Sequence, residues 1–258
     1  MQTQPDLLQQ YRALLVEMTA IYRDFEGAMT KPQRRMAGRN GSVFRFPVQD
    51  AEHAIILKLA AMLNFLNGAL QLCESGVVLA QGALERMADE AAEDVTFLAV
   101  GISHGMTQRH LDFLDYFWRE DFTDFDDTMN SFQSRPQVPR DKIAAAIHAV
   151  GNDPSTGSKV SKIITKSYSG FVHAAAPHVM ELYDVPAGKF RVESSPAYRK
   201  LEHQQDLWNY MYRGAMAIMA AAKAFGSDAH FQQMGASLEE FQDQTQRNGG
   251  FRRKRVAE

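Results

Sequence analysis

The chain of 258 residues holds a single cysteine, and this scarcity limits its chemistry. A lone Cys73 cannot form an intrachain disulfide and suits a reducing compartment, so we expect a cytoplasmic protein. Cys73 lies on an apolar helical stripe, which predicts a core residue rather than a nucleophile. Long apolar runs are absent too. Residues 54–72, the most apolar segment, are interrupted by Lys58 and three side-chain amides, which argues against a membrane span.

Recognisable targeting and catalytic motifs are also missing. The first ten residues lack the basic region and the apolar run of a signal peptide, so none is expected. No Gly-x-Ser-x-Gly turn, phosphate-binding glycine motif, cysteine pair, His-Glu-x-x-His or Glu-x-x-His sequence occurs. We therefore expect no cofactor and no metal. A net charge of -3 gives no overall attraction to nucleic acid or to anionic membranes.

What the chain does contain is helical periodicity. Apolar residues recur three and four apart, which predicts an all-α bundle of seven or eight helices in one domain at residues 1–248. A basic tail at 249–258 is expected to be disordered. Loops are expected at 30–49 and at 123–138, and a helix break is expected at 151–158. The arginines and phenylalanines of residues 30–49 are compatible either with RNA contact or with exposure to solvent. No strand is predicted. The helices that we expect to form the central bundle are 50–76, 77–100, 158–176 and 195–225.

The helix expected at 77–100 carries the most unusual polar pattern. Arg86, Glu90 and Glu93 lie on one stripe that is bracketed by apolar residues, and the opposite stripe is a core seam. One interpretation is a solvated face with intrahelical ion pairs. The other is a buried cluster, whose carboxylates must be met by basic groups of another helix because unpaired buried charges are costly. The stripe expected to supply those groups comprises Lys162, Lys166, Ser169 and His173.

Three stretches resemble a known group of proteins. They are HAIILKLAAMLNFLNGALQLCESG, LERMADEAAEDVTFL and KSYSGFVHAAAPHVMELY. Over roughly residues 50–215 they resemble uncharacterised bacterial helical proteins related to the HEPN-like superfamily. The resemblance implies an all-α bundle, often linked to RNA cleavage, toxins or phage defence. It also implies that an Arg-x-x-x-Glu segment (Arg86, Glu90) faces a Tyr-Ser-x-x-x-His segment (Tyr168, Ser169, His173).

HEPN ribonucleases carry an arginine, a polar residue, four to six further residues and a histidine. Arg140 and Asp141 followed by His148 meet the loosest form of that pattern. On a continuous helix Arg140 and His148 are about 80° apart, so their convergence needs a break or a partner chain.

Three functions therefore remain open. The first is a binding or regulatory module without enzymatic activity. The second is a metal-independent ribonuclease, which requires Arg140 with His148, or Arg86 with His173, to converge in an open groove. The third is a carboxylate and histidine metal protein. RNA, a protein partner and a second copy of the chain are the partners considered. Ligand contacts are expected from Glu93, Tyr168, Ser169 and His203 in the first case, and metal ligands from Glu90, Glu93, His173 and His178 in the third.

Overall fold

The computed structural model describes residues 6–39, 41–134, 136–150 and 154–250, and these residues are mostly helical, as the periodicity predicts. Residues 251–258 of the expected basic tail fall outside the described part. The described helices are α1 (Leu7–Ala28), α2 (Ala51–Ser75), α3 (Val78–His104), α4 (Gln108–Trp118), α5 (Arg140–His148), α6 (Pro154–Val172), α7 (Ala176–Val179), the 3-10 turn η1 (Met180–Leu182), α8 (Ala197–Ala224) and α9 (Asp228–Thr245). The strands are β1 (Gln33–Ala37), β2 (Gly41–Arg45), β3 (Tyr183–Asp184) and β4 (Lys189–Phe190).

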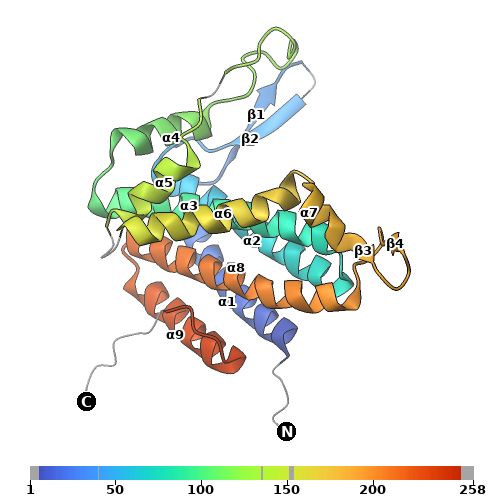
Figure 1. Cartoon of the computed structure of the whole chain (residues 1–258). Coiled ribbons are helices and arrows are strands. Elements are labelled where there is room, and N and C mark those ends of the chain that lie inside the picture. Colours follow the sequence, from blue (N-terminus) through green and yellow to red (C-terminus); the bar gives the residue numbers. More distant parts are fainter. Residues whose placement is uncertain (1–5, 40, 135, 151–153, 251–258) are drawn as a thin grey trace, which may run out of the picture.

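Helix α3 lies at the centre of the bundle (Figure 1). α2 and α8 pack along it, α1 packs against α2 and α8, and α9 covers α1 and α8. α5 and α6 lie on the outer face of α3. We expected the helix at 158–176 to belong to the central bundle. α6 does pack on α3, but on its outer face, and among its described side chains only Phe171 is a buried apolar residue. α1, with seven buried residues that face α2, α8 and α9, contributes more to the core.

Helix α2 begins and ends where the sequence indicates. Asp50 is the N-cap, and its carboxylate accepts a hydrogen bond from the backbone N–H of His53 at 2.9 Å. Gly76 ends the helix with a φ of 75°, a left-handed conformation that glycine adopts without strain. Among the described helices α2 alone is long and apolar enough to cross a membrane, a test that core helices also pass. Its apolar residues pack against α1, α3 and α8.

Residues 30–49, expected to be a loop, contain an antiparallel hairpin. β1 pairs with β2 so that Arg34 lies opposite Phe44 and Met36 lies opposite Ser42. Gly38, with a φ of 66°, sits in the turn. Both strands are five residues long; β1 is largely exposed, β2 alternates half-buried and exposed residues, and neither contains a buried one. Such strands show little hydrophobic alternation, which explains why the sequence does not reveal them.

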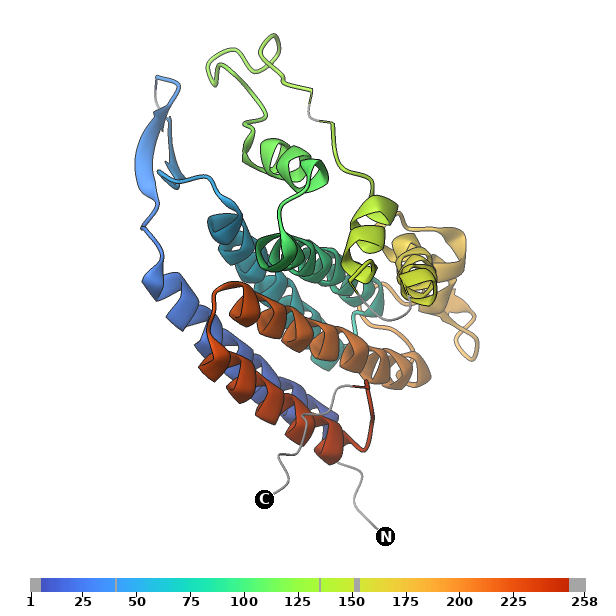
Figure 2. The ribbon, with the colours of Figure 1, turned by 90° about the vertical axis from the view of Figure 1, so that its left-hand side faces the viewer.

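The hairpin lies beside residues 119–133, which we call the acidic loop (Figure 2). The guanidinium of Arg45 donates to Glu120, with an Nη2–Oε2 distance of 2.6 Å. The backbone N–H of Arg39 donates to Asp126 at 3.0 Å. These pairings weaken the interpretation of residues 30–49 as an RNA contact, because part of their positive charge already faces carboxylates.

Helix α6 differs from its expected bounds at both ends. It starts at Pro154, inside the expected break at 151–158, because proline fits the first helical turn, where its missing N–H is not needed. It ends four residues before the expected 176, and Ala174 follows with a φ of 48°. Pro177 then lies in the first turn of α7, a four-residue helix that brings the described α-helices to nine, against seven or eight expected.

Candidate functional site

The polar face of α3 points into the protein. Glu85, Arg86, Asp89, Glu93 and Asp94 are all buried, since α2, α5, α6 and α8 surround the helix. The buried-cluster interpretation is therefore confirmed for Arg86 and Glu93. Glu90, the third residue of the predicted stripe, has a side chain that is 45% exposed and forms the intrahelical pair with Arg86 that the solvated-face interpretation named. The bracketing of the charges by apolar residues was the sequence signal that favoured burial.

One half of this cluster joins α3 to α2 and α5. Arg140, at the start of α5, donates to the carboxylate of Glu93 with an Nη2–Oε2 distance of 2.5 Å, and its other Nη donates to Asp94. It also donates to the backbone carbonyl of Glu90 at 3.2 Å. The ammonium of Lys58 on α2 lies 2.7 Å from the second oxygen of Asp94. Each of these two buried carboxylates thus meets at least one cation.

The other half joins α3 to α8. Arg213 lies 2.5 Å from Asp89 and 3.5 Å from the second oxygen of Glu93. Arg86 pairs within α3, at 2.5 Å from Glu90 and 3.8 Å from Asp89. The four cations and four carboxylates of the two halves balance, as buried charges require. We call these eight residues the α3 network.

The cations of the α3 network correct one expectation. We expected them on the helix at 158–176, but they come from α2, α3, α5 and α8, while Lys162, Lys166 and His173 are exposed. α6 turns its aromatic stripe toward α3 instead, because Phe171 packs against Gly82 where a side chain would not fit. Its basic stripe, on the other side, therefore meets solvent.

Burial and pairing act on the network in opposite directions. Burial raises the pKa of Asp89, and the nearby guanidinium of Arg213 partly offsets it. For Arg140 burial lowers the pKa, but Asp94 and Glu93 outweigh it and raise the pKa overall. Arg140 is therefore firmly held as a cation between its two carboxylates. Both of its Nη groups are engaged by Glu93, Asp94 and the carbonyl of Glu90, and its Nε, which has no partner, is buried.

Beyond Asp89, the polar face of α3 continues toward Glu85, which pairs with no cation in the part of the chain that the structure describes. Glu85 is fully buried, and its closest polar partner is Gln81, whose amide donates to it at 2.7 Å and to the carbonyl of His203 at 3.0 Å. Burial raises the pKa of Glu85 to about 8. His203, expected as a ligand contact, is buried and pairs with Glu181 at 2.6 Å, and Tyr168 packs its ring on Tyr210 at 5.2 Å.

A small cleft borders the α3 network. It has a volume of about 210 Å³, and its polar walls are Glu93, His148, Ser161 and Arg213. The imidazole of His148 and the hydroxyl of Ser161 share a hydrogen bond of 3.0 Å. Arg140, which the resemblance pairs with His148, does not line this cleft, and Arg213 does. In the sequence, Arg213 lies with His203, Asp206 and Tyr210 on one polar stripe of the helix expected at 195–225, and this stripe was its signal. Ser161 had none.

The other expected site residues do not gather. Arg86 is buried and held by Glu90, whereas His173 is exposed beyond the end of α6, so His173 does not join the enclosed cluster. Ser169 is half-buried on α6. His178 shares a hydrogen bond of 2.8 Å with the backbone carbonyl of Ser167. Among the described residues, no group of three or more His, Cys, Asp or Glu side chains could hold a metal ion.

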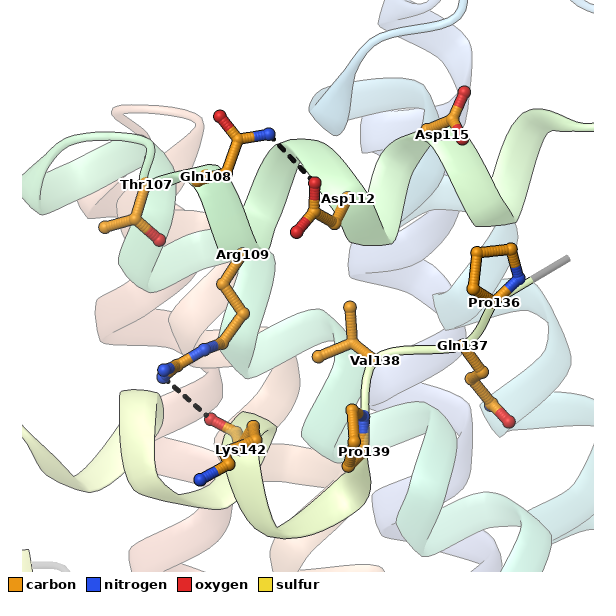
Figure 3. Close-up of a pocket in the computed structure, with 10 residues that line it drawn as sticks. All are labelled: Thr107, Gln108, Arg109, Asp112, Asp115, Pro136, Gln137, Val138, Pro139 and Lys142. Atoms are coloured by element: carbon orange, nitrogen blue, oxygen red, sulfur yellow. Dashed lines mark hydrogen bonds between the residues drawn. The ribbon is translucent and has the colours of Figure 1, made fainter.

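A groove larger than the small cleft lies outside the network, between α4 and α5 (Figure 3). It has a volume of about 750 Å³ and carries Arg109 and Lys142 at one end, with Asp112 and Asp115 further along α4. The extended residues 136–139 form its floor, with Val138 pointing between the two helices and buried. The sequence marked this segment only as a proline-containing loop.

A second cavity of about 420 Å³ lies where the hairpin meets α4, with Phe44, Phe46, Leu57, Phe117 and Trp118 in its walls.

Comparison of the chain with protein-family models, with curated proteins and with solved structures finds no match.

Proposed function

We propose that the protein is a non-enzymatic binding module, and that the α4–α5 groove binds a segment of a protein partner in extended form. One observation carries the proposal: charges of opposite sign line the same groove in order along α4. Arg109 and Lys142 have no carboxylate partner among the described residues, and Arg109 donates to the backbone carbonyl of Lys142 at 3.3 Å. Asp112 accepts only from Gln108, one helical turn before it.

The size of the groove supports this proposal. A volume of about 750 Å³ lies within the range of clefts that bury small ligands or short peptide segments. The α3 network supports it indirectly, because its charges are already matched and need no ligand. By contrast, Arg109 and Lys142 of the α4–α5 groove are exposed at the protein surface, where a partner can reach them.

The charge pattern favours a peptide over RNA. A phosphate backbone next to Arg109 would run on toward Asp112, whose carboxylate has no cation partner among the described residues and repels it. A peptide with an acidic residue near Arg109 and a basic residue further on would match both. The carboxylate of Asp115 pairs with Arg119 in the free chain, but its side chain is 62% exposed and can exchange that partner for a basic residue of the peptide. Arg109 and Asp115 are six residues apart, which is about 9 Å along a helix and about three residues of extended chain.

The experiment is selection of random linear peptides on the purified full-length protein, followed by fluorescence anisotropy with the selected peptide. We expect an acidic residue and a basic residue about three positions apart, and a loss of at least about tenfold in affinity for Arg109→Glu. Lys189→Glu, on the exposed β4, is the matched control and should bind normally. A peptide in which the acidic residue is replaced by lysine should regain affinity for Arg109→Glu only.

Two outcomes reject the proposal. One is selected peptides that bind Arg109→Glu as well as the wild type. The other is a single-stranded RNA oligonucleotide that binds at physiological salt and requires Arg109, since that would make the groove a polyanion site.

We propose a second candidate function, a metal-independent ribonuclease. This function would go with the HEPN-like relationship that the sequence resemblance suggests. The observation that favours it is that His148 and Arg213 line one cleft, where an imidazole could move a proton and a guanidinium could stabilise a phosphate. Cleavage of an RNA oligonucleotide in the presence of EDTA tests it. Activity should vanish in His148→Ala and persist in His230→Ala, whose histidine lies near Asp24 on another side of the bundle. A wild-type protein that leaves RNA intact removes this candidate.

A further inference from the structure

The hairpin and the acidic loop together project from the bundle, and we call them the arm (Figures 1 and 2). The arm carries several of the most exposed large apolar residues among those the structure describes. Met129 is 91% exposed and Met36 is 71% exposed. Phe44 and Phe132 are exposed as well. Apolar side chains gathered on a projecting element mark an interaction surface more often than a scattered set does.

The two faces of the hairpin differ. Cross-strand partners lie on the same face of an antiparallel pair, so Arg34 and Phe44 share one face with Met36 and Ser42. Arg45 lies on the opposite face, and this inner face meets the acidic loop through Glu120. On the outer face the large apolar residues stay exposed: Met36 is 71% exposed, and Phe44, which also borders the cavity beside α4, is 65% exposed. Arg34 has no carboxylate partner among the described residues.

The acidic loop has the complementary composition. Asp124 and Asp127 are exposed, and their carboxylates accept only from their own loop, from the backbone of Asp126 at 2.8 Å and from the amide of Asn130 at 2.9 Å. Met129 and Phe132 are exposed in the same segment. A basic, apolar surface and an acidic, apolar surface thus occur on one arm. The outer face of the hairpin cannot reach the acidic loop of its own chain, because the inner face of the hairpin already packs against that loop.

We propose that two copies of this chain dimerise through their arms, with the outer face of each hairpin packed on the acidic loop of the other copy. A two-fold interface requires a self-complementary surface, in which each contact occurs twice. The arm provides one: Arg34, Met36 and Phe44 of one copy meet the acidic and apolar residues of the partner's loop. Charge matching selects a second copy over an unrelated protein, because both halves of the match are present in the same chain.

Analytical ultracentrifugation of the full-length protein tests this proposal. We expect a dimer that weakens as salt concentration rises. Arg34→Glu should weaken the dimer at least about tenfold, since the reversed contact occurs twice, and so should the double variant Asp124→Lys with Asp127→Lys. Neither variant changes the intrachain pair of Arg45 with Glu120. Lys189→Glu on β4 is the matched control and should dimerise normally.

Mixing the two reversed variants gives the decisive measurement. In a mixed dimer the Glu at position 34 of one variant meets the lysines in the loop of the other. The unchanged Arg34 of the second variant meets the unchanged acidic loop of the first. Both contacts are then between opposite charges, so heterodimers should form with about wild-type affinity. Their formation also shows that both variants are folded. A wild-type protein that stays monomeric up to its solubility limit overturns the proposal. So does a dimer that both variants leave unchanged, or a mixture that fails to restore association.

Discussion

Glu85 makes the stability of the protein depend on pH in a defined direction. Burial raises the pKa of this carboxyl from 4.5 to about 8, and no cation among the described residues compensates it. Well below pH 4.5 the carboxyl is protonated in the folded and the unfolded chain, and its burial carries no ionisation cost. As pH rises toward 8 the unfolded chain releases the proton while the folded chain holds it, so stability falls by about 1.4 kcal/mol per pH unit. By pH 7 the cost is about 3 kcal/mol, and above pH 8 it stays constant.

Glu85→Gln removes this cost and keeps an oxygen acceptor for the amide of Gln81. We expect the variant to match the wild type near pH 4.5 and to exceed it by about 3 kcal/mol at pH 7. Urea denaturation at pH 5, 6, 7 and 8 measures the difference, with Glu193→Gln in an exposed loop as the control. If the difference between the variant and the wild type does not grow with pH, Glu85 is not held as a neutral acid.

Three further results are expected. Arg140→Met should lower the free energy of unfolding by about 3 kcal/mol in urea denaturation, because it leaves two buried carboxylates short of a partner, whereas Arg109→Met in the open groove should cost little. Cys73, whose pKa burial raises to about 12, should react with a thiol reagent only as fast as the chain unfolds, and a reaction with the folded protein within seconds would contradict its burial. Gly82→Ala should destabilise the protein by about 1–3 kcal/mol, because the added Cβ would lie 2.6 Å from the ring of Phe171; a variant as stable as the wild type would mean that α6 is not packed there.

The parts of the fold that local signals determine are the parts that the sequence predicts. The bounds of α2 follow from Asp50 as an N-cap and Gly76 as a left-handed terminator, and both act within one helical turn. The hairpin at 33–45 could not be predicted this way. Its two short, polar strands gain support from the acidic loop, about 75 residues later in the chain, through the pair of Arg45 with Glu120. Such support is invisible to periodicity.

The difference between local and long-range signals also explains how much of the α3 network could be predicted from the sequence. The stripe of Arg86, Glu90 and Glu93 predicts that a charged face of α3 points inward, since periodicity indicates which side of a helix is buried. Arg86 and Glu93 are buried, whereas Glu90 is half exposed and Asp89, outside the stripe, is buried in its place. Periodicity does not fix which neighbour covers that side. Lys58, which interrupts an apolar helix, and Arg213, on a polar stripe, were both visible in the sequence. Choosing them over the lysines of α6 requires the packing order of the helices, which only the tertiary structure gives.

The α3 network has a consequence for both candidate sites, because it holds α5 in place. A helix of nine residues is too short to be stable alone. α5 is fixed at its start by Arg140, bound to α3, and further along by the buried Ile143. The same helix presents Lys142 to the α4–α5 groove and His148 to the small cleft. Arg140 touches neither space, so it acts as a positioning residue for both. Its replacement by methionine should therefore weaken peptide binding through the groove wall, while Arg109→Met weakens it without loss of stability.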